Sequence, residues 1–504
     1  MAHQFLKGVR TDPTLSNADN KQDVDKINTT GSGVIACQIS EHSKDGDEAL
    51  QAFLGHEGSH IEVDEATNSH KTTLSYASIM GLRQDINLVG DNYQWLGSMF
   101  YFGYLAWEYP TNRFLQRLPL GKYSAFNVFM WGATLTCFAA VNNFAGAVAV
   151  RFFLGVFEAA VTPGFALLTS QWYTKREQGF RTSIWFSFNG WAQIIGGLLA
   201  YGIAVGVRKH GADIAGWQII FMVTGLLTSA IGVLFYFIVP DNQLNARWLT
   251  KEERILAIER IRSNEQGVGN KHWKFYQFKE ALVDPKTWLF FFYSLMSDIP
   301  NGGLTNFFSQ LIVSFGYTQE ESLLYGTPGG AVEVVTLLLW GWLTVHYGNR
   351  LAFSSIFLLL AILGMILIVA LPLDNKKGRL AGYYLTQASP VPFVAILSLI
   401  STNVAGYTKK TTVAALYLIA YCVGNIIGPQ VFRPKDAPRY VPAEIVIIVS
   451  WGTCLVTLAC IYSYSKIQNS RKLKLRNSPG YVKLENQGFL DLTDGENPEF
   501  EYAL

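Results

Sequence analysis

A series of apolar blocks, about eleven in number and each of about 20 residues, constrains this chain more than any other feature. Because backbone amides in hydrocarbon must be paired inside their own segment, we expect each block to be a helix. Half of the 504 residues are hydrophobic and only 15% are charged, as suits a protein whose solvent is lipid. The blocks begin near Tyr93, Ser124, Phe144, Thr182, Trp217, Trp288, Leu323, Leu351, Leu380, Thr411 and Ala443. The sequence therefore predicts an all-α, polytopic membrane protein.

Composition excludes several other classes. The net charge of +2 carries no basic excess, so we expect no nucleic-acid partner. The five cysteines are scattered, and no Cys/His spacing suits a metal, so we expect no disulfide framework, metal or cofactor. The chain has no phosphate-binding loop and no pattern typical of nucleophilic catalysis, which argues against an enzyme.

Polar stretches divide the chain into five parts. We assign residues 1–71 to a disordered, cytoplasmic-type tail, 72–239 to an N-terminal transmembrane half, 240–286 to a cytoplasmic central loop, 287–465 to a C-terminal transmembrane half and 466–504 to a C-terminal tail of similar character. The first part lacks the features of a secretory signal. Within the central loop, Thr250 and Glu253 form a capping box, which predicts a short amphipathic helix on the cytoplasmic membrane face.

The basic loops set the orientation but leave a conflict. Loops with Arg113, Lys175, Arg350 and Lys409 alternate with loops that have few basic residues, which places the basic ones in the cytoplasm. The block at Tyr93 would then start outside, after a long polar stretch that has no export signal. One further helix before it would remove the conflict, yet no apolar run there is long enough to span.

Short motifs in a fixed order resemble one family. They are Trp107–Asn112, Arg151–Ala159, Pro240–Asn242, Ala246–Thr250, Gly424–Gln430 and Asp436–Tyr440. Together they are similar to the fungal allantoate-permease type of anion:cation symporter, a branch of the major facilitator superfamily, over roughly residues 72–464. The resemblance implies a major facilitator fold of two six-helix halves that carry a small carboxylate together with protons by alternating access. Family substrates include allantoate, ureidosuccinate, nicotinate, pantothenate, biotin and dipeptides, and the sequence does not choose among them. We expect a monomer in the plasma membrane.

The chain departs from this family in two places. The first helix is missing, cut out between about Asn68 and Lys71, which agrees with the orientation conflict and suggests a splicing or gene-model truncation. A glycan at Asn28 would contradict that interpretation, because it would place the tail outside. The family's cytoplasmic loop motif is only half kept before Arg350. Val345 stands where the motif has Asp, so we expect a weaker restraint on the rocking of the halves.

Arg151 and Glu158 are the first candidate site residues. They lie seven residues apart in one block, which places them on the same helix face. A guanidinium suits a substrate carboxylate, and a carboxylate in a wet cavity can carry a proton. We therefore predict substrate binding by Arg151 and proton coupling by Glu158. A purely structural ion pair is the alternative.

The other candidates lie in three further blocks. Asn301 lies within a Pro300–Gly303 interruption, and Asp298 and Asn306 lie on either side of it. This pattern predicts a broken helix with Asp298 in proton coupling and the two asparagines in substrate binding. The alternative is a kink packed by small residues.

Asn189 and Gln193 are four residues apart on one helix face, and they either bind substrate or join helices. Glu333, which lies within the apolar block that begins near Leu323, is a candidate coupling carboxylate or a partner for a neighbouring helix.

Three rivals to a transporter stay open. A non-transporting remnant would follow if the missing helix is essential to the cavity. A nutrient sensor of the same fold is disfavoured by the modest tails. A membrane-embedded enzyme would need a clustered catalytic constellation, which the sequence does not contain.

Overall fold

The computed structural model describes residues 72–173, 175–246, 249–262, 273–437, 439–478, 481 and 492–504. These residues form helices and turns, with no strand among them. The predicted N-terminal tail, Asn28 and the Asn68–Lys71 junction lie outside the described residues. The described part begins with a helix over residues 72–79, which is too short to cross a bilayer.

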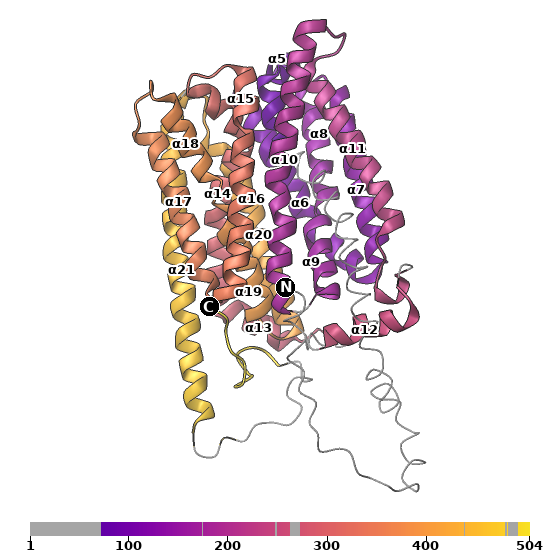
Figure 1. The fold of residues 1–504 in the computed structure, drawn as a ribbon, viewed down its shortest axis with the longest axis vertical. Helices are drawn as coiled ribbons and strands as arrows, with labels where there is room; N and C mark the ends of the chain where they lie inside the picture. The colour runs from indigo at the N-terminus through magenta and orange to yellow at the C-terminus, as the bar shows by residue number, and fades with distance from the viewer. Residues whose placement is uncertain are drawn as a thin grey trace.

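The first half packs as a bundle of long helices (Figure 1). Its elements are α5 (Leu82–Asp85), α6 (Asn92–Arg117), α7 (Leu120–Cys137), η3 (Phe138–Ala140), α8 (Phe144–Glu158), α9 (Val161–Trp172), α10 (Lys175–His210) and α11 (Gly216–Ile238). Helix α6 packs on α8, and α7 packs on α11.

The second half is a bundle of the same kind beside the first (Figure 1). Its elements are α14 (Pro285–Ser314), α15 (Gln319–Tyr325), α16 (Thr327–Tyr347), α17 (Arg350–Ala370), α18 (Lys376–Thr386), α19 (Pro390–Asn403), α20 (Tyr407–Val431), η5 (Pro434–Asp436) and α21 (Val441–Arg476). Helix α14 packs on α20 and α21, while α10 packs on α16 and α6 packs on α20 across the two halves.

The structure contains helices at all eleven predicted blocks. Among the described residues, 8 are long and apolar enough to cross a membrane by length and composition. The remaining three blocks correspond to α6, α7 and α14, which lie alongside them in the bundle (Figure 1). Two of these three, α6 and α14, bury the charged side chains of Glu108 and Asp298 inside the protein, which lowers the apolar content of their spans.

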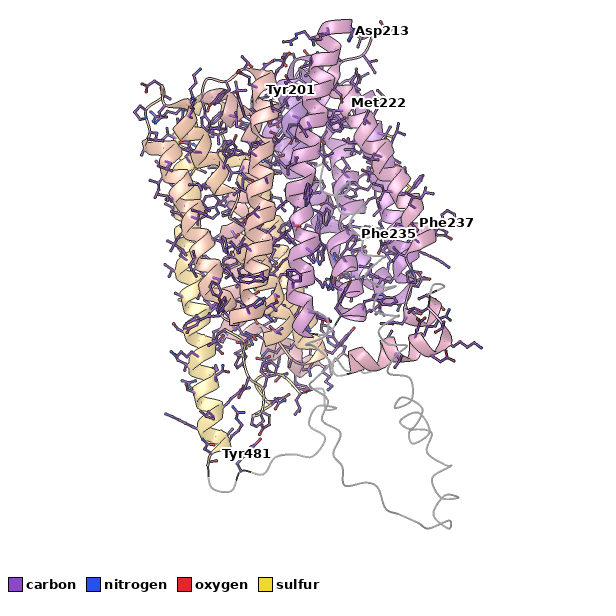
Figure 2. All side chains as sticks on the ribbon, viewed as in Figure 1. Tyr201, Asp213, Met222, Phe235, Phe237 and Tyr481 are labelled. Atoms are coloured by element: carbon purple, nitrogen blue, oxygen red, sulfur yellow. The ribbon has the colours of Figure 1, made fainter. Side chains whose placement is uncertain are left out.

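Large apolar side chains cover the lateral surface of the bundle. On α11, Phe235 is 2% exposed whereas Phe237 is 71% exposed, and Figure 2 shows Phe237 at the outer edge. An apolar residue that faces outward on a membrane helix meets lipid rather than water. The exposed apolar surface therefore supports a multi-pass membrane protein.

One prediction about helix breaks is wrong. Helix α14 runs unbroken through Pro300, where we expected an interruption. The Gly302 and Gly303 backbone packs directly on α20, and a Cβ built on Gly302 would lie 2.8 Å from the Asn425 Cα. This close packing on α20 supports the helix on both sides of the proline.

Polar segments cap the end of the bundle that we assign to the cytoplasm. The predicted capping box is confirmed, since Glu253 Oε2 accepts from Thr250 N at 2.6 Å and Thr250 Oγ1 accepts from Glu253 N at 3.3 Å, and α12 (Lys251–Arg262) follows. A second linker helix, α13 (Phe275–Val283), was not predicted and packs on α20. The predicted basic loops join α6 to α7, α16 to α17 and α19 to α20, which assigns their end of the bundle to the cytoplasm. We call the opposite end, with α5, α15 and α18, the outer end (Figure 1).

The C-terminal tail differs from expectation. Helix α21 continues to Arg476, past residue 465 where we placed the end of the half. Residues 492–504 pack on the bundle, and Tyr502 is only 6% exposed. Composition favoured disorder here, but contacts with distant helices hold the segment in place.

Candidate functional site

The two halves meet through hydrogen bonds toward the outer end. Tyr93 Oη on α6 donates to the Asn306 carbonyl on α14 at 2.7 Å, and Gln94 Nε2 donates to the Phe432 carbonyl at 2.9 Å. The hydroxyls of Ser75 and Ser309 lie 3.1 Å apart. These contacts close the halves on each other near α5 and α15.

Arg151 lies inside the first half with part of its guanidinium unused. The side chain is 2% exposed, and its Nε donates to the Leu96 carbonyl at 3.0 Å. The guanidinium Cζ lies over the Phe100 ring, 5.2 Å from the ring centroid. Its Nη1 is buried and has no hydrogen-bond partner among the described residues. A buried N–H of a charged group without an acceptor is costly, and a carboxylate would satisfy it.

Glycines bring α8 close to α6 at this point. A Cβ built on Gly155 would lie 1.9 Å from the Phe100 carbonyl oxygen, and one on Gly103 would lie 2.0 Å from the Phe152 carbonyl oxygen. Only residues without a side chain permit this approach. The crossing therefore fixes Arg151 against α6.

Glu158 shares the buried face of α8 with Arg151, as predicted. Its side chain is 3% exposed and lies within electrostatic range of Arg151 and of the hydroxyls of Tyr104 and Tyr421. Because Tyr421 belongs to α20, Glu158 faces the second half.

Asp298 and Asn301 belong to one polar cluster centred on a residue that sequence reasoning missed. Asn425 on α20 donates to Asp298 Oδ1 at 3.2 Å and accepts from Asn301 Nδ2 at 2.9 Å. Ser294 Oγ donates to Asp298 Oδ2 at 3.1 Å. Asn425 lies within the glycine-rich Gly424–Gln430 motif. A polar amide residue inside an apolar block was the sequence feature that could have identified it.

Aromatic rings join the two halves beside these charges. Tyr421 lies 5.8 Å from Tyr101, 6.0 Å from Tyr104 and 5.7 Å from Phe393, measured between ring centroids, and Phe393 lies 5.5 Å from Phe186. Tyr421 is also within electrostatic range of both Asp298 and Glu158. The two predicted carboxylates therefore approach one tyrosine from opposite halves.

Three predicted residues lie away from this cluster. Gln193 Nε2 donates to the Gly326 carbonyl at 2.9 Å and to Tyr383 Oη at 2.8 Å, so in this conformation it joins the two halves. Asn189 donates to the Phe186 carbonyl of its own helix at 3.1 Å. Glu333 on α16 is 6% exposed and lies within electrostatic range of Tyr383.

Asn306 lies at the outer contact between the halves. Its Nδ2 donates to the Gly302 carbonyl of its own helix at 2.8 Å, and its buried Oδ1 has no hydrogen-bond partner in the part of the chain that the structure describes. The structure thus brings Glu158 and Asp298 toward Tyr421, with Arg151 within electrostatic range of Glu158 and Asn301 joined to Asp298 through Asn425. The other predicted residues lie apart from this group.

Comparison with known proteins gives the family. The model of the Major Facilitator Superfamily matches residues 70–429. The chain is 42% identical to an uncharacterised transporter of Schizosaccharomyces pombe, over 86% of this chain and 84% of that protein. It is 40% identical to allantoate permease of Saccharomyces cerevisiae over 86% and 82%, and 34% identical to a thiamine pathway transporter of the same yeast over 86% and 81%.

Solved structures agree on the fold. A bacterial homologue of the human lysosomal transporter Spinster, in an inward-facing and unoccupied conformation, superposes with a TM-score of 0.56 at 16% identity over 86% of this chain and 99% of that one. The helices, the family match and the relatives lead to one conclusion. The chain belongs to the major facilitator superfamily and, within it, to the fungal allantoate-permease-type family of transporters.

Proposed function

We propose that this protein imports a small organic anion together with protons across the plasma membrane. The observation that carries the proposal is Arg151, a buried guanidinium with an unused Nη1, held next to Glu158. A fixed guanidinium matches the two oxygens of a carboxylate. The name of the allantoate permease relative supports an anion of the ureide or vitamin type.

Coupling to protons would follow from competition for Arg151. A substrate carboxylate that bound the Arg151 guanidinium would weaken the electrostatic attraction between Arg151 and Glu158. The buried Glu158 carboxylate would then bind a proton more readily. Asp298 lies on the other side of Tyr421 and would hold or pass that proton within the second half. Anion and proton would thus enter the site together.

Transport would proceed by alternating access of the two halves. The outer contacts of Ser75, Tyr93 and Gln94 would have to break for substrate to enter from outside. Glu333 and Gln193 flank the second contact between the halves, around Tyr383, so we assign Glu333 a coupling role during this movement.

The test is uptake by the full chain in proteoliposomes. We expect labelled allantoate or another small carboxylate to accumulate when the lumen is made alkaline. Arg151→Ala should lower uptake by on the order of 100-fold, because a charge-assisted pair is worth roughly 3 kcal/mol. Glu158→Gln should keep substrate exchange but lose accumulation driven by the pH gradient, and Arg433→Gln at the outer end serves as the control.

The same experiment separates transport from its rivals. Binding of a carboxylate without uptake would favour a sensor. A stably folded protein that neither binds nor carries any of the candidate carboxylates would overturn the proposal and favour a non-transporting remnant.

A further inference from the structure

Residues 493–504, which we call the C-terminal strap, lie against the cytoplasmic end of the second half near α13 and α19 (Figure 1). The strap begins with a tight turn in which Thr493 Oγ1 accepts from Glu496 N at 3.1 Å and Glu496 Oε2 accepts from Thr493 N at 3.0 Å. Its Asp494 side chain is 1% exposed. A carboxylate buried this completely needs compensating partners.

The partners of Asp494 are two buried lysines from two helices. Asp494 Oδ2 lies 2.6 Å from Lys286 Nζ on α14, and Oδ1 lies 3.0 Å from Lys409 Nζ on α20. Lys409 also pairs with Glu280 at 2.9 Å and Asp284 at 2.8 Å. Among the described residues, Lys286 has only Asp284, at 3.9 Å, as a further acid. Asp494 is therefore the main counter-charge of Lys286.

Two asparagines bind the backbone of the strap. Asn403 on α19 accepts from Ala503 N and donates to Ala503 O, both at 2.8 Å. Asn469 on α21 makes the same pair with Tyr502, also at 2.8 Å and 2.8 Å. The Tyr502 hydroxyl in turn donates to Asp494 Oδ2 at 2.8 Å. The strap is thus held along its length by paired hydrogen bonds.

The strap also reaches the loop whose motif is incomplete. Arg350 N, at the start of α17, donates to the Leu504 carbonyl at 2.7 Å, and Arg350 Nη1 donates to Ser398 Oγ at 2.8 Å. The first half has a matching contact, because Asp241 follows α11 and accepts from Lys122 N near the start of α7 at 3.1 Å. In each half, a segment that follows the last helix therefore contacts the start of an earlier one, α7 in the first half and α17 in the second.

We propose that the strap is a permanent clasp that holds α14, α17, α19, α20 and α21 together at the cytoplasmic end, with Asp494 joining α14 to α20 through Lys286 and Lys409. Its partners belong to the second half and to α13, so rocking of the halves does not require its release. Helices α14 and α20 also carry Asp298 and Asn425. Asp494 is therefore a positioning residue for the site, and this role rests on the proposed transport.

The test combines release and locking of the strap in the full chain. Asp494→Asn removes the counter-charge, Asn469→Ala loosens the strap without unpairing a buried charge, and Glu501→Gln removes an exposed charge of the same strap as the control. Asn403→Cys with Ala503→Cys, in a background without the native cysteines, allows a disulfide to lock the docked strap. Disulfide yield reports docking, and uptake by proteoliposomes reports transport.

We expect Asp494→Asn and Asn469→Ala to lower the maximal uptake rate, by on the order of tenfold for Asp494→Asn, with little change in KM. The disulfide should preserve uptake in the otherwise unchanged protein and restore it in the Asp494→Asn protein. Loss of uptake on locking would show that the strap must release, and normal uptake by a protein whose strap is undocked would show that it is dispensable; either overturns the clasp. If no carboxylate is carried at all, disulfide yield still reports whether Asp494 docks the strap, so failure of the transport proposal is recognised separately.

Discussion

The side-chain amide of Gln193 on α10 donates to the hydroxyl of Tyr383 on α18 at 2.8 Å, across the interface between the two halves. The same nitrogen donates to the Gly326 carbonyl, and the backbone carbonyl of Gln193 accepts from Tyr76 Oη at 3.0 Å. One residue therefore ties three segments together at the closed side of the molecule.

We predict that Gln193→Ala shifts the protein toward the outward-open state. Loss of two hydrogen bonds between the halves should cost the closed arrangement about 1–2 kcal/mol, which corresponds to a population change of roughly tenfold. Labelling of Ser309→Cys by an impermeant thiol reagent from outside should become faster. Gln218→Ala is the matched control, because Gln218 bonds to the Ala139 carbonyl within the first half. An unchanged labelling rate with Gln193→Ala would contradict the prediction.

The crossing of α6 and α8 gives a second prediction. Gly155→Ala should destabilise the protein by about 1–3 kcal/mol, because the new methyl group would overlap the Phe100 carbonyl and push α8 away from α6. Since Arg151 bonds to α6, substrate binding should weaken as well. Gly202→Ala is the control, because a Cβ there meets nothing within 4 Å, and it should be neutral or slightly stabilising. Thermal unfolding in detergent measures both, and equal melting temperatures would refute the close-contact argument.

Exchange of the Asp298 and Asn425 side chains tests the polar cluster. Asn425→Asp alone would set two carboxylates side by side and should cost about 2 kcal/mol at neutral pH, less at pH 5 where one can be protonated. The combination of Asn425→Asp with Asp298→Asn restores one acid and one amide, and it should recover most of that stability. The double variant should still lose proton-driven accumulation if the position of Asp298 matters. A double variant no more stable than Asn425→Asp alone would rule out the pairing.

The strap predicts a defined dependence of stability on pH. Burial by itself would raise the pKa of the Asp494 carboxyl, but Lys286 and Lys409 hold that pKa at about 2, below its ordinary 3.8. A pKa that is lower in the folded state contributes stability above the unfolded value and loses it as the pH falls through the folded value. The contribution should therefore be constant above about pH 5, worth about 2 kcal/mol, and should disappear between about pH 4 and pH 2.

Thermal unfolding of the purified protein and of Asp494→Asn between pH 3 and pH 7 measures this contribution. The difference in melting temperature should be largest near neutral pH and should shrink toward pH 3. Glu501→Gln, which changes an exposed acid in the same strap, should show little difference at any pH. A constant difference from pH 3 to pH 7 would mean that Asp494 does not titrate as the structure requires.

The sequence by itself determined the spans and the shared helix face of one candidate pair. Lipid demands about 20 apolar residues in helix, and that local rule located every long helix, including α6 and α14, which are not among the 8 described helices apolar enough to span by composition. Helical periodicity alone placed Arg151 and Glu158 on one face. The capping box at Thr250 was equally local, because its two residues are three apart.

Only the tertiary structure decided which residues meet. Asn425 joins Asp298 over 127 positions, Gln193 joins Tyr383 over 190, and Asp494 joins Lys286 over 208. The helix through Pro300 likewise depends on α20 packed against its glycines. Such contacts leave no periodicity or spacing in the sequence, because they form only when distant segments pack together and exclude solvent from between them. Local sequence patterns thus determine where the helices are, whereas the packing of those helices determines which residues make up the candidate site.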